Sequence, residues 1–455
     1  MPRRHKKHFH DGLPKDTALE LPNPFDLSHE FLRYFQEIEE KGNHVYVTGR
    51  AGTGKSTFLK YFRLNTKKKI AVVAPTGIAA INVSGQTVHS FFRLPHQFIQ
   101  KDQIKKVPGS RRIFSELETL IIDEVSMMRA DLMDAVDYSL RLNKGKMNLP
   151  FGGVQIVLIG DLFQLPPIID KLLAPHYGEF YETPYFFSAH IFKEASFSHL
   201  HFDKVYRQKD PIFMDLLNKI RDKTFELEDL AALNERVLPA SEIEDCVTLT
   251  PTNAAAQTMN ESRLSRLRGS EHFYEATLTG AFDAASYPTE TSLRLKVGAH
   301  VLMIKNDPEK RWVNGSTGEV VSLDEQAIQV KIGDQKYDVE PVTWEKIKYS
   351  FDEETETIRE EVVGSFEQFP MKLAWAITIH KSQGLTFDRV AVDLGRGAFT
   401  HGQVYVALSR CRSLEGLILK RPILARDVIF DSRISDWPLN EKKESLILRA
   451  AEDLF

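Results

Sequence analysis

The residues with the clearest chemical potential lie between positions 49 and 57. Residues 49–56 read GRAGTGKS, which fits the phosphate-loop pattern G-x-x-x-x-G-K-[ST] at every fixed position. Glycines let the backbone curl so that several N–H groups point at one phosphate. The Lys55 ammonium can pair with the β- and γ-phosphates, and the Ser56 hydroxyl can complete the shell of a magnesium ion. We therefore expect nucleotide contacts from these residues: Gly49, Ala51, Gly52, Thr53, Gly54, Lys55, Ser56 and Thr57.

The flanking sequence places this loop correctly. Residues 44–48 are typical of a short buried strand, and residues 57–64 of a helix start, so the helix N-terminus would face the bound anion. The alternative is a chance glycine-rich turn, which the flanking strand and helix disfavour.

Two acidic residues follow a second apolar stretch. Residues 120–124 read LIIDE, which indicates a buried strand that ends in two carboxylates. An acid at the end of such a strand, facing a phosphate loop, can hold magnesium, and the next acid can activate the attacking water. We assign Asp123 to the metal and Glu124 to the water. The alternative is a pair of solvated acids at a strand end.

A third polar group comes after a further strand, predicted at residues 155–159. The segment that follows reads GDLFQLPP, and its Gln164 is expected to reach the γ-phosphate. A simple exit from strand to loop is the other interpretation.

The composition limits the class of protein to which these sites can belong. The chain has 455 residues, 42% of them hydrophobic, which favours a globular protein of roughly three domains. The first residues are basic without a following apolar stretch, so residues 1–24 are expected to be a disordered basic arm and not a secretory signal. Only Cys246 and Cys411 are present, which indicates a reducing compartment. The net charge of −4 means that any nucleic-acid surface must be a local groove.

Strands that alternate with helices predict the domain organisation. Residues 25–195 are expected to form a doubly wound α/β domain with the nucleotide at the carboxyl ends of its strands, and residues 94–112 a small excursion from it. Residues 196–296 and 364–455 are expected to form a second α/β domain, with a strand at 200–205 and helices at 372–381 and 401–411.

The pattern changes between residues 297 and 363. Short alternating strands at 300–304, 319–323, 327–332 and 336–339 are separated by hairpin signals, which predicts a small inserted β-barrel. The acidic segment 352–361 is expected to be a loop or hairpin. The loop at 305–317 is basic and aromatic, and we expect it to hold or split DNA. It carries Lys305, Lys310, Arg311, Trp312 and Asn314. The alternative is a solvated hairpin with Trp312 packed inside.

Eight blocks in one order carry a resemblance: GRAGTGKST, APTGIAAINVSGQTVHSFF, LIIDEVSMM, GDLFQLPPI, VYRQKDPIF, TPTN, AITIHKSQGLTFD and VYVALSRC. They resemble the superfamily-one DNA helicases, most closely the petite-integration-frequency (Pif-one) family, over residues 43–420. The resemblance implies two RecA-like P-loop motor domains with ATP and Mg²⁺ between them and an SH3-like inserted barrel. It also implies an ATP-dependent helicase that translocates 5′ to 3′ on single-stranded DNA, which crosses the top of the motor domains.

The resemblance also implies roles for individual residues. Arg207 and Arg410 match arginine fingers that reach the γ-phosphate, although each alone could be an ordinary surface ion pair. Gly384 is expected on the nucleotide side. Aromatic residues near the DNA track could stack on bases or belong to the core. The residues expected to contact DNA in the motor domains are Thr76, His89, Phe92, Thr250, Asn253, His380, Lys381 and Ser382.

One departure from the family pattern concerns the adenine. The family's glutamine before the phosphate loop is missing, which leaves Asn23, Phe25 and Gln36 as weak candidates. The short N-terminal region favours a bacterial or archaeal source and a cytoplasmic, nucleoid-associated location. The protein is separately expected to be a monomer. Single-strand to double-strand junctions, forks or G-quadruplexes are the expected DNA, in repair, recombination or replication. Two alternatives stay open: a RecD-like translocase subunit of a larger complex, and an ATP-gated DNA-binding switch with little unwinding.

Overall fold

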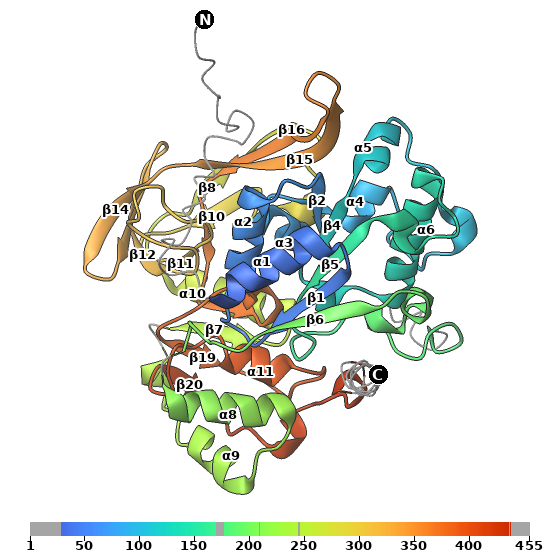
Figure 1. Cartoon of the computed structure of the whole chain (residues 1–455). Helices are drawn as coiled ribbons and strands as arrows, with labels where there is room; N and C mark the ends of the chain where they lie inside the picture. Colours follow the sequence, from blue (N-terminus) through green and yellow to red (C-terminus); the bar gives the residue numbers. More distant parts are fainter. Residues whose placement is uncertain (1–28, 170–176, 209, 244–245, 436, 438–455) are drawn as a thin grey trace, which may run out of the picture.

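A computed structural model describes residues 29–169, 177–208, 210–243, 246–435 and 437 (Figure 1). The predicted basic arm at 1–24 and the adenine candidates Asn23 and Phe25 lie outside the described residues.

The first motor domain is built on a six-stranded parallel sheet with the strand order β3-β2-β4-β5-β1-β6. Strands β2, β4 and β5 and most of β1 are apolar and buried, as strands of a parallel sheet are when helices cover both of its faces. The strands are β1 His44–Gly49, β2 Ile70–Ala74, β3 Gln86–Thr87, β4 Thr119–Ile122, β5 Gln155–Ile159 and β6 Phe197–Phe202. The helices are α1 His29–Lys41, α2 Lys55–Asn65, α3 Gly77–Asn82, α4 Val88–Phe92, α5 Arg111–Glu116 and α6 Ala130–Lys144.

Strand β6 corrects the predicted boundary at residue 195. The sequence pattern assigned this strand to the second domain, but β6 pairs with β1 along its whole length. Leu200 and Phe202 on β6 pack against Phe31 and Phe58 in one buried cluster, so burial of these side chains fixes the strand in the first domain.

The second motor domain has a four-stranded parallel sheet with the order β18-β7-β19-β20 (Figure 1, lower half). Its strands are β7 Val247–Thr250, β18 Ala376–Thr378, β19 Val390–Val392 and β20 Leu417–Leu419. Its helices are α8 Pro211–Asp222, α9 Leu227–Asn234, α10 Asn253–Arg266 and α11 Gln403–Leu408.

The helix predicted at 372–381 is wrong. This segment forms β17 Met371–Leu373, then β18, then a single 3₁₀ turn at His380–Ser382. Strand β17 pairs with β11, and β18 pairs with β7. The segment is apolar enough for either structure, and pairing with strands distant in sequence decides between them.

The β-rich region contains a five-stranded antiparallel sheet with the order β14-β13-β12-β11-β17. The four predicted strands are present as β11 His300–Met303, β12 Thr317–Leu323, β13 Ile328–Ile332 and β14 Gln335–Val339. The region extends beyond the predicted limits of 297 and 363, because β17 closes the sheet. Strands β8 His272–Glu275, β9 Thr277–Gly280 and β10 Ser292–Leu295 precede it.

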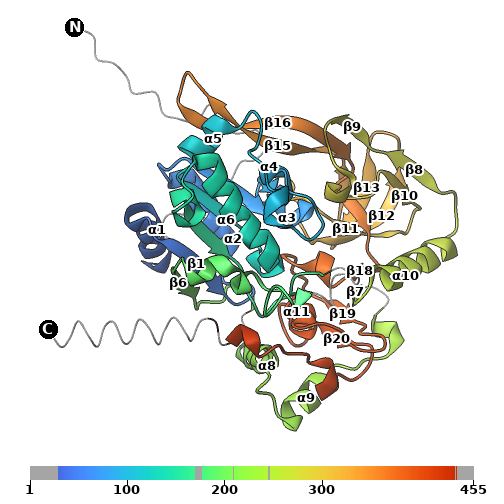
Figure 2. The same ribbon diagram turned by 90° about the vertical axis from the view of Figure 1, so that its right-hand side faces the viewer.

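A long hairpin of β15 Val342–Asp352 and β16 Thr357–Gln368 joins this region to the first motor domain. The hairpin expected around 352–361 is the tip of this larger element. Figure 2 shows the hairpin running along the top of the molecule beside α4 and α5. The Tyr349 hydroxyl accepts the Val72 N–H at 3.0 Å and donates to the Val72 carbonyl at 3.3 Å. Because β3 is only two residues long, Tyr349 completes the edge of β2 that β3 leaves open.

An ion pair of 2.6 Å between Arg63 and Glu360 also fastens the hairpin to α2.

None of the helices in the described part of the chain combines the length and the apolar character needed to cross a bilayer.

We expect Tyr349→Phe to destabilise the docked hairpin. The ring would still pack, but the Val72 N–H and carbonyl would lose their partner at a buried position, which costs about 1–3 kcal/mol. Chemical denaturation and faster amide exchange in residues 70–74 would report this loss. Tyr61→Phe, at a half-buried ring on α2, is the matched control; equal stability and exchange in both variants would contradict the docking role.

Candidate active site

A cleft of about 1310 Å³ lies between the two motor domains. The first domain contributes the phosphate loop, Glu124 and Gln164, and the second contributes groups from three separate segments. The second-domain side of the lining includes Arg207, Asp210, Gly384, Thr386, Arg410 and Arg412. The nucleotide-site residues predicted on the second domain, Arg207, Gly384 and Arg410, therefore line the same cavity as the phosphate loop.

The phosphate loop has the backbone that its glycines allow. Gly52 has a φ of +81°, and a Cβ there would lie 2.4 Å from the Cβ of Arg207, so a side chain is excluded. The Lys55 ammonium donates to the carbonyls of Gly49 at 2.6 Å and Arg50 at 3.0 Å. Burial lowers the pKa of Lys55, while Asp161 and Glu124 oppose that shift. A phosphate would replace these weak carbonyl partners with a charged one.

The two acids at the end of β4 are buried. Glu124 has a φ of 49° and lines the cleft, while Asp123 is 8% exposed. Burial raises the pKa of Asp123, and repulsion from Glu124 adds to the shift. Burial also raises the pKa of Glu124, against the opposing charge of Lys55. A buried carboxylate beside a hydroxyl-bearing phosphate loop is a donor set that fits a hard, oxygen-seeking cation such as Mg²⁺.

The two arginines differ in how firmly they are held. Arg410 is 1% exposed, and its guanidinium donates to the carbonyls of Val406, Ser382 and Leu385 and to the Ser409 hydroxyl. Burial, followed by repulsion from Arg207, lowers the pKa of Arg410 to about 9. In the described part of the chain, the hydrogen bonds of Arg207 are long, 3.5 Å each, to the carbonyls of Ser409 and Gly384.

Arg410 is buried and Arg207 is half-buried, and their hydrogen bonds run to carbonyls and a hydroxyl, which disfavours an ordinary surface ion pair for either. Two guanidinium groups that face the same cleft, with Glu124 as an opposing charge, can bind an anion.

A second cavity of about 630 Å³ lies between the first motor domain and the long hairpin. Its lining includes two residues predicted to bind DNA, Thr76 and His89. It also includes Arg93, His96, Lys346 and Lys348, which the sequence did not single out. His89 stacks on His96 with ring centres 4.3 Å apart, and both of its ring nitrogens are buried without a hydrogen-bond partner. Burial lowers the pKa of His89 to about 4.

The family model of the PIF1-like helicase matches residues 27–228, and a helicase model matches residues 353–446. The ATP-dependent DNA helicase Pif1 of Bdellovibrio bacteriovorus is 33% identical over 395 residues, which cover 84% of this chain and 85% of that protein. The chain belongs to the PIF1-like helicase family.

Other members of the PIF1-like family extend the comparison. The chain is 31% identical to the PIF1 helicase of Emericella nidulans, but it spans only 64% of that protein's length. The structure of Bacteroides Pif1 in complex with ADP-AlF4 superposes with a TM-score of 0.85 at 36% identity and covers 92% of this chain and 97% of that chain. Bacteroides Pif1 bound to single-stranded DNA gives a TM-score of 0.66 at 37% identity, covering 92% and 98%.

Several residues expected to bind DNA in this PIF1-like protein are in the wrong place for side-chain contact. Phe92 is 1% exposed and belongs to the hydrophobic core of the first motor domain. Trp312 is 6% exposed and belongs to the core of the β-rich region. The Thr250 and Ser382 hydroxyls are buried and donate to backbone carbonyls. The aromatic and short polar patterns that suggested DNA contact instead reflect packing and local hydrogen bonds.

The loop at 305–317 is also less available than predicted. Arg311 forms a bidentate contact with Asp307, at 2.7 and 2.9 Å, and its guanidinium lies 4.8 Å from the Trp312 ring centre. Lys305 donates to the Thr343 carbonyl at 2.8 Å, and the half-buried Asn314 donates its N–H to Asn306.

The other predicted DNA contacts lie nearer to solvent. Asn253 and Lys381 are exposed, and His380 is half-buried. The Thr76 hydroxyl caps α3 by accepting the Ala79 N–H.

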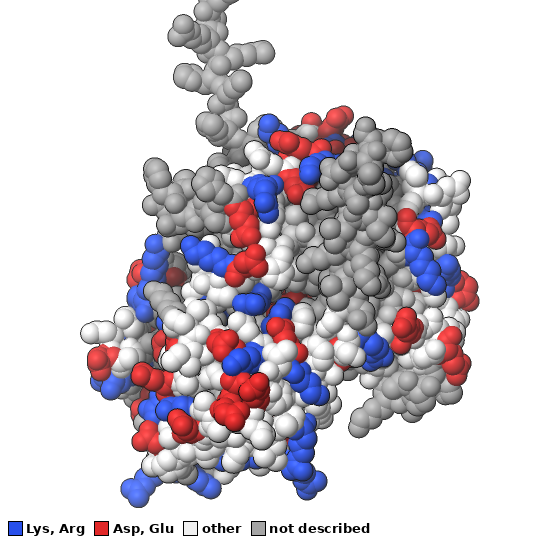
Figure 3. All heavy atoms as spheres, turned by 60° about the horizontal axis from the view of Figure 1, so that its bottom comes forward, with Lys and Arg blue, Asp and Glu red and all other residues white. Residues whose placement is uncertain are grey.

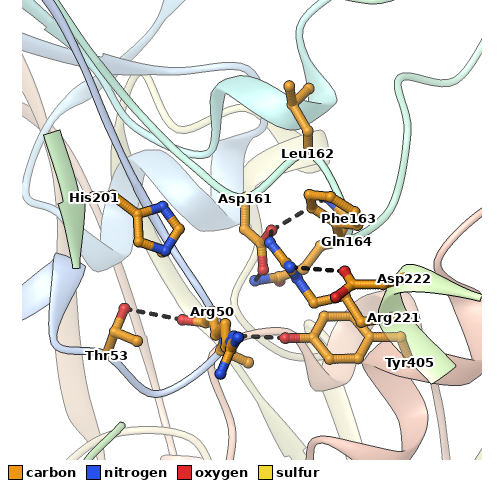
Figure 4. Close-up of polar contacts among 12 residues, drawn as sticks. Arg50, Thr53, Asp161, Leu162, Phe163, Gln164, His201, Arg221, Asp222 and Tyr405 are labelled. Atoms are coloured by element: carbon orange, nitrogen blue, oxygen red, sulfur yellow. Dashed lines mark hydrogen bonds and ion pairs between the residues drawn. The ribbon is translucent and has the colours of Figure 1, made fainter. Parts of the chain in front are cut away.

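Two tyrosines, one that lines the nucleotide cleft and one that contacts the phosphate loop, were missed at the sequence level. Tyr206 is 44% exposed and lines the cleft with Phe31; its position directly before Arg207 was the available signal. The Tyr405 hydroxyl accepts the Ala51 N–H at 3.1 Å (Figure 4), and its place in the VYVALSRC block was the corresponding signal. Gln36, on α1, is not among the residues that line the cleft in the described part of the chain.

The different anchoring of the two arginines makes a prediction. Arg207→Lys should lower ATP turnover by at least roughly tenfold, because a point charge does not reproduce the guanidinium fork, and leave folding intact. Arg410→Lys should lower turnover and also destabilise the protein by about 1–3 kcal/mol, because buried carbonyls lose their donors. Turnover assays with thermal unfolding test both variants. Normal turnover in either variant would remove that arginine from the site.

Proposed function

We propose that this protein is an ATP-dependent DNA helicase that translocates 5′ to 3′ on single-stranded DNA. The observation that carries the proposal is the cleft in which Arg207 and Arg410 of one domain face the phosphate loop and Glu124 of the other. An ATP γ-phosphate between the domains would pair with cationic groups of both at once. ATP binding would therefore draw the domains together, and hydrolysis would release them.

The side chains have distinct parts in this reaction. Lys55 would leave the Gly49 and Arg50 carbonyls to pair with the phosphates, and Glu124 would accept a proton from the attacking water. Arg207 and Arg410 would stabilise charge that develops on the phosphoryl oxygens. Ser56 and Asp123 would hold Mg²⁺, which neutralises phosphate charge when bound. Tyr206 offers an exposed ring on which the adenine could stack.

The DNA track proposed here runs through the cavity under the long hairpin. Arg93 of the first motor domain and Lys348 of the hairpin are exposed cations that line it, which suits phosphates. His89 also lines this cavity, with both of its ring nitrogens buried. The face shown in Figure 3 instead has acidic and basic side chains interspersed, as expected from the net charge of −4.

Related structures support this choice of partner. Bacteroides Pif1 has been solved with single-stranded DNA, and another structure concerns unwinding at forked double-stranded DNA by two coordinating Pif1 helicases. We extend both kinds of DNA to this chain. The SH3-like character of the inserted region, the monomeric state, the cytoplasmic location and a role on G-quadruplexes remain predictions.

The proposed activity is tested first by ATP hydrolysis with and without single-stranded DNA. We expect stimulation by DNA, loss of nucleotide binding in Lys55→Ala, and retained binding without turnover in Glu124→Gln. Wild-type turnover in Glu124→Gln would contradict its assignment. Unwinding of 5′-tailed but not 3′-tailed or blunt duplexes would support the polarity. Hydrolysis without unwinding of any duplex would favour the RecD-like translocase, and DNA binding with little turnover the ATP-gated switch.

The DNA track makes a separate prediction. Arg93→Ala together with Lys348→Ala should weaken binding to single-stranded DNA and reduce the salt slope of the binding constant by up to about two. Affinity measured across a salt series tests this. Lys67→Ala together with Lys193→Ala removes two exposed cations outside the cavity as a control; equal slopes for the two double variants would place the DNA elsewhere.

A further inference from the structure

Arg221, on α8 of the second motor domain, crosses to the first domain. Its guanidinium carbon lies 3.5 Å from the centre of the Phe163 ring, and its Nη2 lies 3.8 Å from Oδ1 of Asp161. Its Nη1 donates to Asp222 at 2.9 Å. Arg221 is 9% exposed, so its charge has been taken out of water and set against groups of the other domain.

The partner carboxylate is hydrogen-bonded to a residue that lines the nucleotide cleft. Oδ1 of Asp161 accepts the Phe163 N–H at 3.2 Å, and Oδ2 accepts the Gln164 side-chain amide N–H at 3.1 Å (Figure 4). A carboxylate only accepts hydrogen bonds, so it holds the Gln164 nitrogen toward itself and leaves the Gln164 oxygen on the other side of the amide. Gln164 lines the nucleotide cleft.

The second domain holds the same loop at two more points. The His401 Nδ1 accepts the Asp431 N–H at 3.1 Å, so its Nε2 carries the proton and donates to the Leu162 carbonyl at 3.1 Å. Gly402 has a φ of +70°, and a Cβ there would lie 2.4 Å from the Gln164 carbonyl oxygen. The residues between Asp161 and Leu165 therefore take their position from the second domain.

We propose that Arg221 is a positioning residue for ATP hydrolysis, acting through Asp161 to fix the Gln164 amide. The inference rests on the proposed ATPase function and deepens it. When the second domain lies against the first, Arg221 neutralises and orients Asp161, and the Gln164 oxygen is held ready to accept a hydrogen bond from the attacking water or from a group at the γ-phosphate. When the domains separate, Asp161 loses this partner and Gln164 loses its fixed orientation. Domain closure thus controls Gln164 as well as the arginines.

The test is the ATPase rate of Arg221→Gln at saturating single-stranded DNA. We expect kcat to fall by roughly 10- to 100-fold because a misplaced catalytic group is costly, with KM for ATP changed less than about threefold. Lys219→Gln is the control on the same helix. Its amine pairs with Asp215 at 3.1 Å and Asp229 at 2.8 Å within the second domain, so it should keep the wild-type kcat.

A double variant separates positioning from a structural role. If Arg221 acts through Gln164, then adding Arg221→Gln to Gln164→Ala should lower kcat by less than about a further twofold, and Arg221→Lys should recover part of the loss. A kcat for Arg221→Gln near that of wild type, or a loss that multiplies fully on Gln164→Ala, would overturn the proposal.

Two controls keep the outcome unambiguous. If Arg221→Gln does not fold, Phe163→Leu removes the ring beneath the guanidinium and should reproduce the kcat loss; a wild-type kcat there would overturn the proposal. A wild-type protein without DNA-stimulated ATPase would instead refute the proposed function.

Discussion

The cleft between the two motor domains depends on three cations whose hydrogen bonds in the described structure run to neutral groups. Lys55 donates to carbonyls, and Arg207 and Arg410 donate to carbonyls and a hydroxyl, while Glu124 supplies an opposing charge nearby. The cost of burying such cations is high unless an anion joins them. A nucleotide phosphate is the group that removes this cost. Binding of the nucleotide is therefore expected to stabilise the closed arrangement of the two motor domains.

The contacts that join the domains around this cleft include apolar packing of Ala51 and Leu165 against the second domain and several directional contacts. The Tyr405 hydroxyl meets the Ala51 N–H, His401 meets the Leu162 carbonyl, and Arg221 lies over Phe163. Each of these depends on angle and distance, so a small rotation of one domain breaks them together. The relative position of the domains can therefore respond to whether a nucleotide occupies the cleft. A purely apolar interface would be less sensitive to such a rotation, because apolar contact is not directional.

The long hairpin adds a second connection, between the β-rich region and the first motor domain. Tyr349 completes the open edge of β2, and Arg63 pairs with Glu360. The cavity beneath the hairpin exists only because β15 crosses the first domain at this point. DNA bound in this cavity would contact both the β-rich region and the first motor domain, and so would link the two.

The sequence by itself determined the parts that are local. The phosphate loop, the acids that follow β4 and the hairpins after His300 depend on short-range backbone geometry and hydrophobic period, which neighbouring residues specify. The order of the eight blocks was enough to suggest the family. Lys55, Glu124, Gln164, Arg207 and Arg410 could all be named before their positions were known, because each lies in such a block.

Only the tertiary structure decided which strands pair and which side chains are accessible. Strand β6 joins the first domain, and residues 371–378 form strands and not a helix, because partners distant in sequence complete their hydrogen bonds. Phe92 and Trp312 are as aromatic as any base-stacking residue, yet both are buried. Arg221 had no local signal at all: its chemistry arises from a contact with Phe163 and Asp161, about sixty residues away, which exists only when two domains meet.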